Sequence, residues 1–526
     1  MAALSSILRL VWASMPYYAA IALVTYLLLF TTYQIFLHPL SRYPGPLLAK
    51  LSNAYNGFYA HQKCLHLVTR QNQLKYGPVV RQGPNKLVFN SISALQDIYK
   101  NDRITKPRSY QAVGPGRRVP NMFATRDKKL HRARRQVVGQ ILTDRSLQAF
   151  EPTMIEQVDI FISQLLASAQ STEPVNMSIR TRQLGMDIAG LLSFGYEFNL
   201  QTTDEHRFMF TTLDGQVPSS NVYFNFYSLR PWVRWITMLL VGKTRERTTR
   251  LMEKIVTTRM ALEKDARHDL YSFVAHALDA KSGGLRQSEL WAEAQFFLTA
   301  AGETTKTTIS AAVFYLSRNP EVYEKLAHEI RSAFTNGGEI NGAALTSCRY
   351  LRACIDESLR MSPPVSGILW RERAPDENDS QPLVVDGHVI PPGTVVGVNT
   401  YSLHHNEEYF PDPFAFNPER WLDSSTPEAA KLVRNAFIPF SVGSRACAGK
   451  SMAYKEISLV LAKTLLYFDF NAAPGKLGDV GAGNPDLGPG RERPGEFQLY
   501  DNFSSSHDGP YLTFRSRGDF GKDLSR

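Results

Sequence analysis

The chain has 526 residues, of which 43% are hydrophobic and 21% are charged. This composition is typical of a globular protein and excludes a disordered, fibrous or collagen-like chain. The formal net charge of +10 allows anionic lipid, an acidic protein or nucleic acid as a partner. Because no nucleic-acid-binding motif accompanies the densest basic run, residues 126–135, we do not expect nucleic acid to be a partner.

The first apolar stretch is long enough to cross a membrane. No charged residue lies between Leu10 and Leu37, and residues 17–37 supply about 21 mainly apolar positions, which suffice to span a bilayer core as a helix. We therefore predict an N-terminal lead (residues 1–16) followed by a transmembrane anchor. Because its second half contains polar residues, the anchor could also be tilted or shallow. A cleaved signal peptide is the main alternative to an anchor.

The basic residues that flank this stretch predict its orientation. Arg9 is the only lysine or arginine before it, whereas Arg42 and Lys50 follow it closely. The excess of positive charge on the cytosolic side of membrane proteins places the bulk of the chain in the cytosol. We therefore predict a single-pass membrane protein whose globular part faces the cytosol.

A proline-rich segment connects the predicted anchor to the rest of the chain. Pro39, Pro44 and Pro46 lie in residues 38–50, and proline fixes φ and restricts the residue before it. This pattern predicts a stiff, non-helical hinge, although an ordinary helix stop explains it equally well. No linker interrupts residues 51–526, which we expect to form one domain.

The four cysteines are too few and too scattered for a disulfide framework. No Cys-x-x-Cys motif or Cys/His pairing indicates zinc. This usage fits a reducing compartment and leaves room for one chemically important cysteine among Cys64, Cys348, Cys354 and Cys447.

The hydrophobic periodicity predicts a mainly α fold with a small β portion. Amphipathic helical patterns separated by short polar stretches fill most of residues 130–359. Glycine and proline crowd into residues 471–496, which we interpret as a surface loop. Strand-like runs lie near Val79–Asn90, Leu383–Ile390, Val395–Asn399 and Phe497–Phe514.

The strongest chemical signal is the loop of residues 440–449, FSVGSRACAG. If Cys447 binds haem iron, its thiolate is a strongly donating axial ligand that favours O–O cleavage. Gly443 and Gly449 would let the backbone turn tightly beside a flat macrocycle, Arg445 would pair with a propionate, and Phe440 would pack against the ring. The alternative is a buried structural cysteine in a glycine turn, but chance produces this pattern with a probability on the order of 10⁻⁴.

The loop resembles the haem-binding signature of the cytochrome P450 family at every fixed position, and the resemblance covers residues 43–514. It implies the cytochrome P450 fold and a haem b (iron protoporphyrin IX) with Cys447 as the axial thiolate. The proline hinge and the style of the sequence most resemble microsomal members from filamentous fungi. The resemblance therefore implies the endoplasmic reticulum membrane as the location.

A Glu-x-x-Arg motif precedes the cysteine loop. Glu357 and Arg360 are three residues apart, share one helix face and can pair. On its own, this motif occurs by chance on the surface of most proteins that contain it. In this order it resembles the buried pair of the family, and Arg420, within the segment 416–421, resembles the arginine that completes a triad. Since a buried ion triad adds little net stability, we expect it to hold the haem pocket in register.

The helical pattern from Ser288 to Arg318 carries a second candidate constellation. Ala300 and Thr304 are one turn apart and share a face, and Glu303 offers a carboxylate. The stretch resembles the oxygen-activating helix of the family, which implies that Glu303 and Thr304 deliver protons during the activation of dioxygen. Ala301 stands where glycine is usual, which leaves the local helix distortion open, and a packing or capping threonine pair is the alternative.

Three further residues resemble haem-propionate contacts of the family. His131 and Arg135 stand where a tryptophan and an arginine are usual. Arg371 follows the paired prolines and resembles the arginine of the next strand. His131 is also compatible with a plain surface residue.

The resemblance also implies a substrate pocket and partners. A lipophilic small molecule is the expected substrate, because the pocket-lining stretches are apolar and rich in aromatic residues. The chain carries no flavin, nicotinamide or iron–sulfur motif, so an NADPH-dependent reductase is implied, and the basic run 126–135 could steer it. The stretches that resemble pocket walls are Thr105–Phe123, Phe208–Trp235, Ala294–Thr304, Val365–Leu369 and Tyr500–Asp508.

These observations predict a monooxygenase that hydroxylates or epoxidises a lipophilic molecule, in the manner of enzymes of fungal secondary-metabolite biosynthesis. A reductase-independent haem-thiolate isomerase or dehydratase is a second hypothesis, against which Glu303 and Thr304 argue, since such enzymes need no proton relay. A non-catalytic haem carrier is a third.

Overall fold

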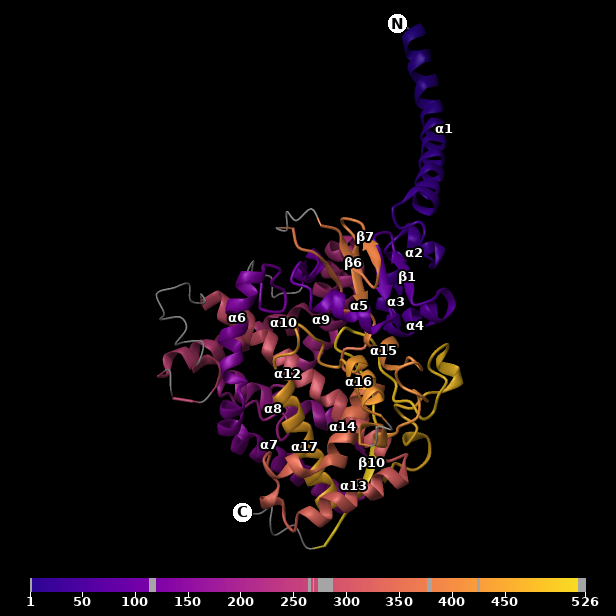
Figure 1. Ribbon diagram of the computed structural model, residues 1–526. Coiled ribbons are helices and arrows are strands. Elements are labelled where there is room, and N and C mark those ends of the chain that lie inside the picture. Colours follow the sequence, from indigo (N-terminus) through magenta and orange to yellow (C-terminus); the bar gives the residue numbers. More distant parts are fainter. Residues whose placement is uncertain are drawn as a thin grey trace.

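The computed structural model describes residues 2–112, 120–263, 266–267, 269–272, 287–375, 381–422 and 426–518. Helices make up 60% and strands 9% of it, which confirms the prediction of a mainly α fold with a small β portion. One long helix projects from the helical body as an isolated rod (Figure 1). Of the predicted pocket stretches, residues 113–119 lie outside the described residues, and the side chain of Ala294 is not described.

The projecting rod consists of α1 (Ala2–Thr32) and the short π-helix η1 (Tyr33–Leu37). The helix starts at Ala2, so most of the predicted lead continues the same helix as the anchor. Residues 15–37 form an apolar span with a mean hydropathy of 1.8, of which 6% is buried. Because so little of this apolar surface contacts the body, the span is a candidate membrane anchor rather than a core helix.

The base of the rod is bound to the body by a buried arginine. Arg81 donates from Nη1 to Gln34 O at 2.7 Å and from Nη2 to Gln34 Oε1 at 2.8 Å, while its backbone N–H donates to Pro44 O at 2.8 Å. The predicted hinge is not wholly non-helical, because residues Leu47–Leu51 form α2. Pro46 immediately precedes this helix, where a missing N–H disturbs no intrahelical bond.

A five-stranded sheet lies beside the base of the rod, in the order β1-β2-β8-β5-β3 (Figure 1). Strand β8 pairs with β2 in parallel and with β5 antiparallel, so the sheet joins the N-terminal segment to the segment around Arg371. The strands of the three sheets are β1 (Val79–Gly83), β2 (Lys86–Phe89), β3 (Ile104–Thr105), β5 (Arg371–Arg373) and β8 (Val395–Val398); β6 (Leu383–Val385) and β7 (His388–Ile390); and β4 (Val175–Asn176), β9 (Phe468–Ala472) and β10 (Tyr511–Ser516).

Three of the four predicted strand regions contain strands where expected. The fourth, 497–514, is strand only from Tyr511 onward. Its first part is a loop closed on itself, because Tyr500 N donates to Ser506 O at 2.8 Å and Ser506 N donates to Tyr500 O at 3.0 Å. The alternating apolar residues of this part pack into the hydrophobic clusters from a loop, so their pattern resembled that of a strand.

The body is built around α12 (Gln287–Leu316), which agrees with the helical pattern expected from Ser288. Gly302 of α12 packs so tightly on α8 that a Cβ there would lie 2.4 Å from the sulfur of Met186. The other helices are α3 (Ala54–His61), α4 (Leu65–Tyr76), α5 (Ile92–Tyr99), α6 (Lys128–Ile141), α7 (Asp144–Ser171), α8 (Met177–Phe194), α9 (Phe208–Asn225), α10 (Arg230–Ala261), α13 (Pro320–Ala333), α14 (Arg349–Met361), α15 (Thr400–His404), α16 (Pro427–Ala436) and α17 (Lys450–Tyr467).

The main hydrophobic core joins these helices at their apolar faces. Ile309, Leu359 and Leu461, from α12, α14 and α17, are all fully or almost fully buried in it. Burial of aliphatic side chains from elements far apart in the chain is the main force that holds such helices together. The core thus fixes α12 and α17, the helix that follows the cysteine loop, relative to each other.

Candidate functional site

The cysteine loop is a closed turn that leads into α17. The backbone N–H of Cys447 donates to Phe440 O at 2.8 Å and that of Ala446 to Gly443 O at 3.1 Å. Gly443 has φ of +79°, and a Cβ there would lie 1.9 Å from the carbonyl oxygen of Tyr99. Only glycine satisfies both requirements, so this turn depends on it.

The side chain of Cys447 is both accessible and affected by the protein around it. Its side chain is exposed, yet burial raises its pKa, while the N–H of Gly449 and the charges of Arg135 and Lys450 act to lower it. The N–H and the two cations all stabilise a thiolate.

Five cationic or titratable side chains converge beside this loop: Lys106, His131, Arg135, Arg371 and Arg445. Burial lowers the pKa of His131 to about 3, with further lowering by Arg445, Lys106, Arg135 and Arg371. Burial and Arg371 lower the pKa of Arg445 to about 10. Among the described residues none of the five forms an ion pair with a carboxylate, although the negative charge of Asp127 acts to raise the pKa of Arg445. The protein therefore neutralises this positive charge only in part.

Backbone carbonyls hold these cations in place. Arg445 donates from Nη1 to Thr125 O at 2.6 Å, and Arg135 donates from Nη1 to Ala446 O at 2.5 Å. Arg371 donates from Nη1 to Trp370 O at 2.9 Å. His131 is buried on the inner face of α6, which decides against the surface alternative for it.

Lys106 is a member of this cluster that the sequence did not single out. It is buried, its Nζ donates to Phe123 O at 2.6 Å, and it lies 3.6 Å from the centroid of the Phe123 ring. Burial, Arg371 and Arg445 together lower its pKa well below the ordinary value. No motif signals it, because only the fold brings residue 106 next to the arginines.

On α12, Phe296, Ala300 and Thr304 are half-buried, while Glu303 and Thr305 are buried. The three half-buried positions are spaced four residues apart and therefore lie along one face of the helix, which we call the stripe on α12. The Thr304 hydroxyl donates to Ala300 O at 2.8 Å. The α-helix continues through Ala301 without interruption.

Glu303 points away from this stripe toward α8. Its carboxylate accepts from Arg182 Nε at 2.7 Å and from the Lys306 ammonium, and Arg182 also pairs with Asp214 of α9 at 2.7 Å. Burial acts to raise the pKa of Glu303, but Lys306 and Arg182 outweigh it and lower the pKa. The side chain is therefore an ionised carboxylate at neutral pH.

The predicted pocket stretches converge in one aromatic cluster. Phe123 stacks on Phe296 of α12 with centroids 5.4 Å apart and contacts Phe503 edge-on at 5.3 Å, while Tyr110 stacks on Phe224 at 4.3 Å. Ile368, from the fourth stretch, lies in the same cluster. All five stretches therefore meet, and Phe123 connects the cluster to Lys106 and the cations beside Cys447.

The predicted triad is assembled and fully buried at its centre. Arg360 donates to Glu357 from Nε at 2.9 Å and from Nη2 at 2.8 Å, and Arg420 donates from Nε to Glu357 Oε1 at 3.0 Å. Burial alone would raise the pKa of Glu357, but Arg360 and Arg420 lower it. The backbone N–H of Asn417 adds a further bond at 3.0 Å.

A buried histidine connects the triad to the cysteine loop. Arg360 donates from Nη1 to His404 O at 2.9 Å, and His404 Nε2 accepts from the backbone N–H of Ile438 at 2.9 Å. Ile438 lies two residues before Phe440. The sequence did not single out His404, because a histidine in a short helix carries no distinguishing pattern.

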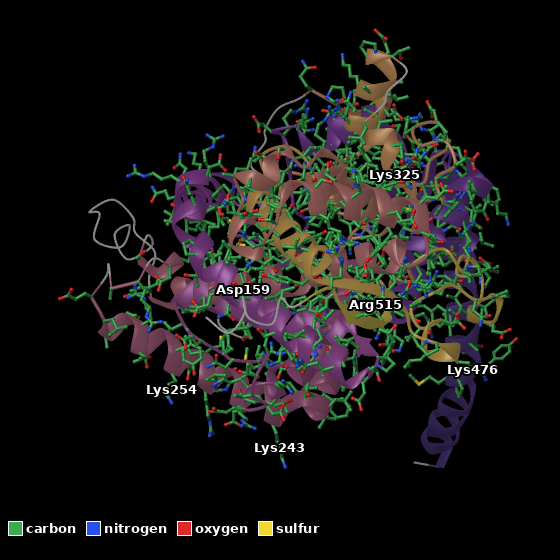
Figure 2. All side chains as sticks on the ribbon, turned by 90° about the horizontal axis from the view of Figure 1, so that it is seen from below. Asp159, Lys243, Lys254, Lys325, Lys476 and Arg515 are labelled. Atoms are coloured by element: carbon green, nitrogen blue, oxygen red, sulfur yellow. The ribbon has the colours of Figure 1, made fainter. Side chains whose placement is uncertain are left out.

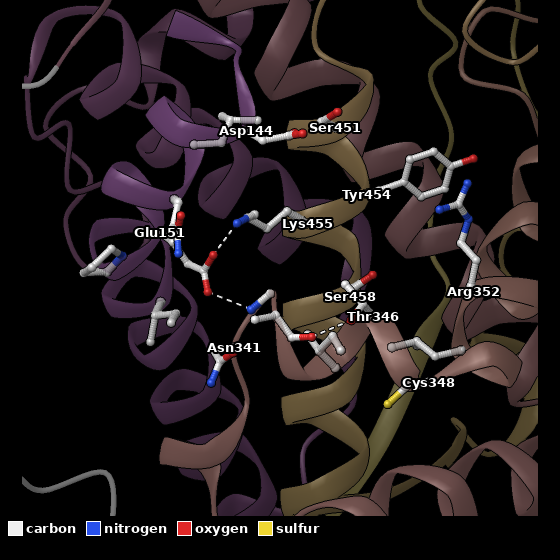
Figure 3. Close-up of a pocket in the computed structure, with 18 residues that line it drawn as sticks. Asp144, Glu151, Asn341, Thr346, Cys348, Arg352, Ser451, Tyr454, Lys455 and Ser458 are labelled. Atoms are coloured by element: carbon white, nitrogen blue, oxygen red, sulfur yellow. Dashed lines mark hydrogen bonds and ion pairs between the residues drawn. The ribbon is translucent and has the colours of Figure 1, made fainter.

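A hollow of about 800 Å³ between α7, α17 and the segment 341–352 is separate from this site (Figure 3). Glu151 lies at its centre and binds the Lys455 ammonium and the N–H of Gly342. None of its lining residues was predicted as a site residue, and the polar groups Asp144, Asn341 and Arg352 make it a poor match for a lipophilic substrate.

Comparison with known proteins identifies the family. A sequence profile described as Cytochrome P450 matches residues 44–479. The chain belongs to the cytochrome P450 family. It is 35% identical over 499 residues to the cytochrome P450 monooxygenase AKT7 of Alternaria alternata, which covers 92% of this chain and 94% of that protein.

Further fungal relatives of this cytochrome P450 give the same result. It is 32% identical to the monooxygenase apf7 of Gibberella fujikuroi, over 92% of this chain and 95% of the relative. It is 33% identical to the monooxygenase poxM of Penicillium oxalicum, over 93% of each chain. The protein is therefore an oxidoreductase of the cytochrome P450 monooxygenase class, which implies a haem-thiolate cofactor.

The residues around Cys447 fit such a cofactor. The buried cations beside the loop match the two carboxylates of a haem, and the side chain of Cys447 is exposed near Arg135. A Cβ at Gly449 would meet no protein atom within 4 Å, so the space beside the loop can accept a flat ring. Phe440 is half-buried beside the same loop.

Proposed function

We propose that this protein is a haem b monooxygenase that uses electrons from a separate reductase to hydroxylate or epoxidise a lipophilic small molecule in fungal secondary-metabolite biosynthesis. The observation that carries the proposal is the convergence of the Cys447 loop, the unpaired cations and the stripe on α12. Of the three hypotheses, only this one uses all three features.

In this proposal Cys447 ligates the iron, and the iron supplies the chemistry that activates dioxygen. Arg445, Arg135 and Arg371 bind the propionates by charge-assisted hydrogen bonds. His131, which is neutral at physiological pH because of its low pKa, can donate one ring N–H to the same oxygens. Phe440, Gly443 and Gly449 shape the loop beside the ring.

Thr304 lies on the stripe of α12, one turn after Ala300, and its half-buried hydroxyl can accept and donate a proton there. Glu303 supports proton transfer as an ionised carboxylate that attracts water toward α12. Its two cationic partners hold it in one orientation, so its function depends on that network remaining intact.

The aromatic cluster supports a lipophilic substrate. Phe123, Phe224 and Phe503 contact one another edge-on or at a tilt, and Phe123 stacks on Phe296 of the stripe on α12. Such walls exclude water and bind apolar or flat molecules without demanding specific hydrogen bonds. The substrate class therefore follows from the wall, while the oxidised position depends on a few side chains.

The electron donor is proposed to dock on the cysteine side. On α6, Lys129 and Arg132 are exposed while His131 and Arg134 face inward, so the basic run 126–135 divides into an outer and an inner face. The outer face can attract an acidic NADPH-dependent reductase, mainly by raising the association rate.

The membrane is the proposed location, with the anchor in the endoplasmic reticulum and the body in the cytosol. Besides the anchor, the first half of α10 exposes large apolar side chains: Trp232 and Trp235 are 67% and 60% exposed, and Leu240 is 78% exposed. Lys243 and Lys254, farther along α10, point outward from the body (Figure 2). Apolar residues beside lysines suit an interface with anionic lipid.

The proposed function is tested by the visible spectrum of the reduced carbon monoxide adduct. We expect the red-shifted Soret band of thiolate ligation, its loss in Cys447→Ser and its retention in Cys64→Ser. An imidazole-like spectrum of the native protein would contradict the proposal. Comparison of metabolites with and without the protein would then identify the substrate.

A further inference from the structure

A chain of buried hydrogen bonds lies behind the aromatic cluster. The indole N–H of Trp370 donates to Oδ1 of Asn225 at 2.9 Å. Asn225 Nδ2 donates to Oδ1 of Asn221 at 3.0 Å, and Asn221 Nδ2 donates to Oδ1 of Asp501 at 3.1 Å. Each of the four residues is at most 4% exposed. The chain therefore connects the segment before β5, the end of α9 and the loop that contains Asp501.

The bonds of this chain point in one direction and satisfy both asparagine side chains. Besides the bonds just described, Asn225 Nδ2 donates to Asn221 O at 2.9 Å, and Asn221 Nδ2 donates to Asp501 O at 2.8 Å. Neither asparagine has a buried side-chain atom without a partner. Hydrogen bonds that are linked in this way strengthen one another, and a satisfied buried network favours one arrangement of the side chains around it.

The chain also holds three rings of the cluster, which we call the aromatic wall: Tyr110, Phe224 and Phe503. The backbone N–H of Trp370 donates to the Tyr110 hydroxyl at 3.1 Å, and that of Phe503 donates to Oδ1 of Asp501 at 3.1 Å. Phe224 immediately precedes Asn225 on α9. Its ring lies 4.3 Å from that of Tyr110 and 5.0 Å from that of Phe503, measured between centroids. Each ring of the wall is thus attached to a member of the chain or adjacent to one.

The backbone of Phe503 adopts a conformation that its own side chain disfavours. Its φ is +80°, and such a conformation costs a bulky residue on the order of 1–3 kcal/mol. It persists only where the surroundings hold it. Here the Asp501 carboxyl accepts the Phe503 N–H and packs on Gly367, where a Cβ would lie 2.8 Å from Asp501 Oδ2. The position of Phe503 therefore depends on Asp501 and on the asparagine that binds it.

We propose that Asn221 and Asn225 are positioning residues that lock the aromatic wall and give the pocket a preference for a flat ring system over a flexible chain. The inference deepens the proposed monooxygenase function and rests on it. A wall that is already ordered loses little conformational entropy when a ligand binds, and ring faces and edges complement a planar molecule. The two asparagines act through the wall and do not touch the substrate themselves.

A purely structural role of the asparagines predicts a different result. Loss of a buried hydrogen bond lowers the stability of the folded state whatever ligand is bound. It would therefore affect flat and flexible ligands equally. A role in positioning the wall changes the ratio of the two affinities, and this ratio defines the experiment.

The first test titrates the haem-loaded, full-length protein with N-phenylimidazole and N-hexylimidazole, followed by the shift of the Soret band. Both probes present the same imidazole nitrogen, and their tails have equal numbers of carbon atoms. We expect the native protein to prefer the phenyl probe. Asn225→Leu should lower the affinity for it by about tenfold and leave the affinity for the hexyl probe within about twofold.

The control for this titration is Asn341→Leu, which makes the same chemical change beside the separate hollow. It should leave both affinities at the native value. Equal losses for the two probes in Asn225→Leu, or no loss for either, would overturn the proposal.

The second test measures amide hydrogen exchange of residues 500–506 in the full-length protein and needs neither turnover nor a bound probe. Asn221→Leu removes both bonds to Asp501, so we expect exchange in this loop to become about tenfold faster. Asn341→Leu should exchange at the native rate. Native exchange in Asn221→Leu would show that the chain does not hold the wall and would refute the proposal.

The two proposals fail in different ways. If the native protein lacks the thiolate spectrum, the monooxygenase function fails, while hydrogen exchange still reports whether Asn221 holds the loop. If the spectrum is normal and the probes lose affinity equally, only the role of the asparagines fails. Should Asn225→Leu not fold, Asn225→Asp removes the same two donated bonds at nearly unchanged size and gives both readouts.

Discussion

The indole N–H of Trp421 donates a hydrogen bond to Oε2 of Glu357 at 3.0 Å. Together with Arg360, Arg420 and the backbone N–H of Asn417, it gives this buried carboxylate five donated bonds. A phenylalanine, the residue usual at this position by family resemblance, could not make this bond. Trp421 thus takes part in the triad instead of only packing beside it.

Replacement of Trp421 by phenylalanine should therefore destabilise the protein by about 1–3 kcal/mol, because a buried charged acceptor loses one donor. The midpoint of thermal unfolding would measure the loss. Trp235→Phe is the matched control, since Trp235 is 60% exposed and its replacement should change stability by less than about 0.5 kcal/mol. Equal midpoints for the two variants would show that the indole bond contributes nothing.

Lys106→Met should weaken haem retention without weakening the apoprotein. The variant removes a buried cation that has no anionic partner among the described residues, while a charge-assisted bond to a propionate would be lost. Loss of about 1.5–3 kcal/mol corresponds to roughly tenfold to hundredfold faster haem transfer to an acceptor protein. Lys129→Met, on the exposed face of α6, should transfer haem at the native rate.

Thr304→Ala should uncouple electron use from product formation, with release of reduced oxygen species, because the half-buried hydroxyl of the stripe on α12 is removed. Thr304→Ser retains the hydroxyl and should restore most of the coupling. Oxygen consumption measured against product distinguishes the two variants. Native coupling in Thr304→Ala would favour the non-catalytic carrier.

The stability of the protein should fall as the pH rises from 6.5 to 8. The folded pKa of Glu456 is about 8 and its ordinary value is 4.5, so the native state binds more protons than the unfolded state between these values. The stability it contributes is complete below pH 4.5 and is lost as pH rises through 8, by up to about 1.4 kcal/mol per pH unit. Glu456→Gln should flatten this slope, measured as unfolding midpoints across the pH range.

The apolar surface of α10 should contribute to membrane binding apart from the anchor. A protein that lacks residues 1–37 should still sediment with anionic lipid vesicles, and Trp232→Ser with Trp235→Ser should abolish that association, because two exposed indoles lose their contact with lipid. Lys476→Ser, on a distant turn, is the control. Unchanged binding of the double variant would assign all membrane contact to the anchor.

Local signals in the sequence were sufficient for the cysteine loop, the Glu-x-x-Arg pair and the long helices. Each depends on neighbours within about one or two helical turns, and spacing alone brings such residues together. Gly443 illustrates this, since its turn is closed within residues 440–447. The prediction of a strand over 497–510 was wrong, because these residues form a loop. Their alternating apolar side chains pack against elements that are distant in the chain.

The sequence by itself therefore determined the fold class, the family resemblance and the residue that would bind iron. Only the tertiary structure decided that Lys106 joins the arginines, that Glu303 is ionised and that Glu456 is not. The protonation state of a buried group depends on burial and on the charges around it. Arg182 of α8 supplies part of the charge around Glu303, whereas burial raises the pKa of Glu456. Both environments are made by segments far apart in the chain, and no local pattern encodes them.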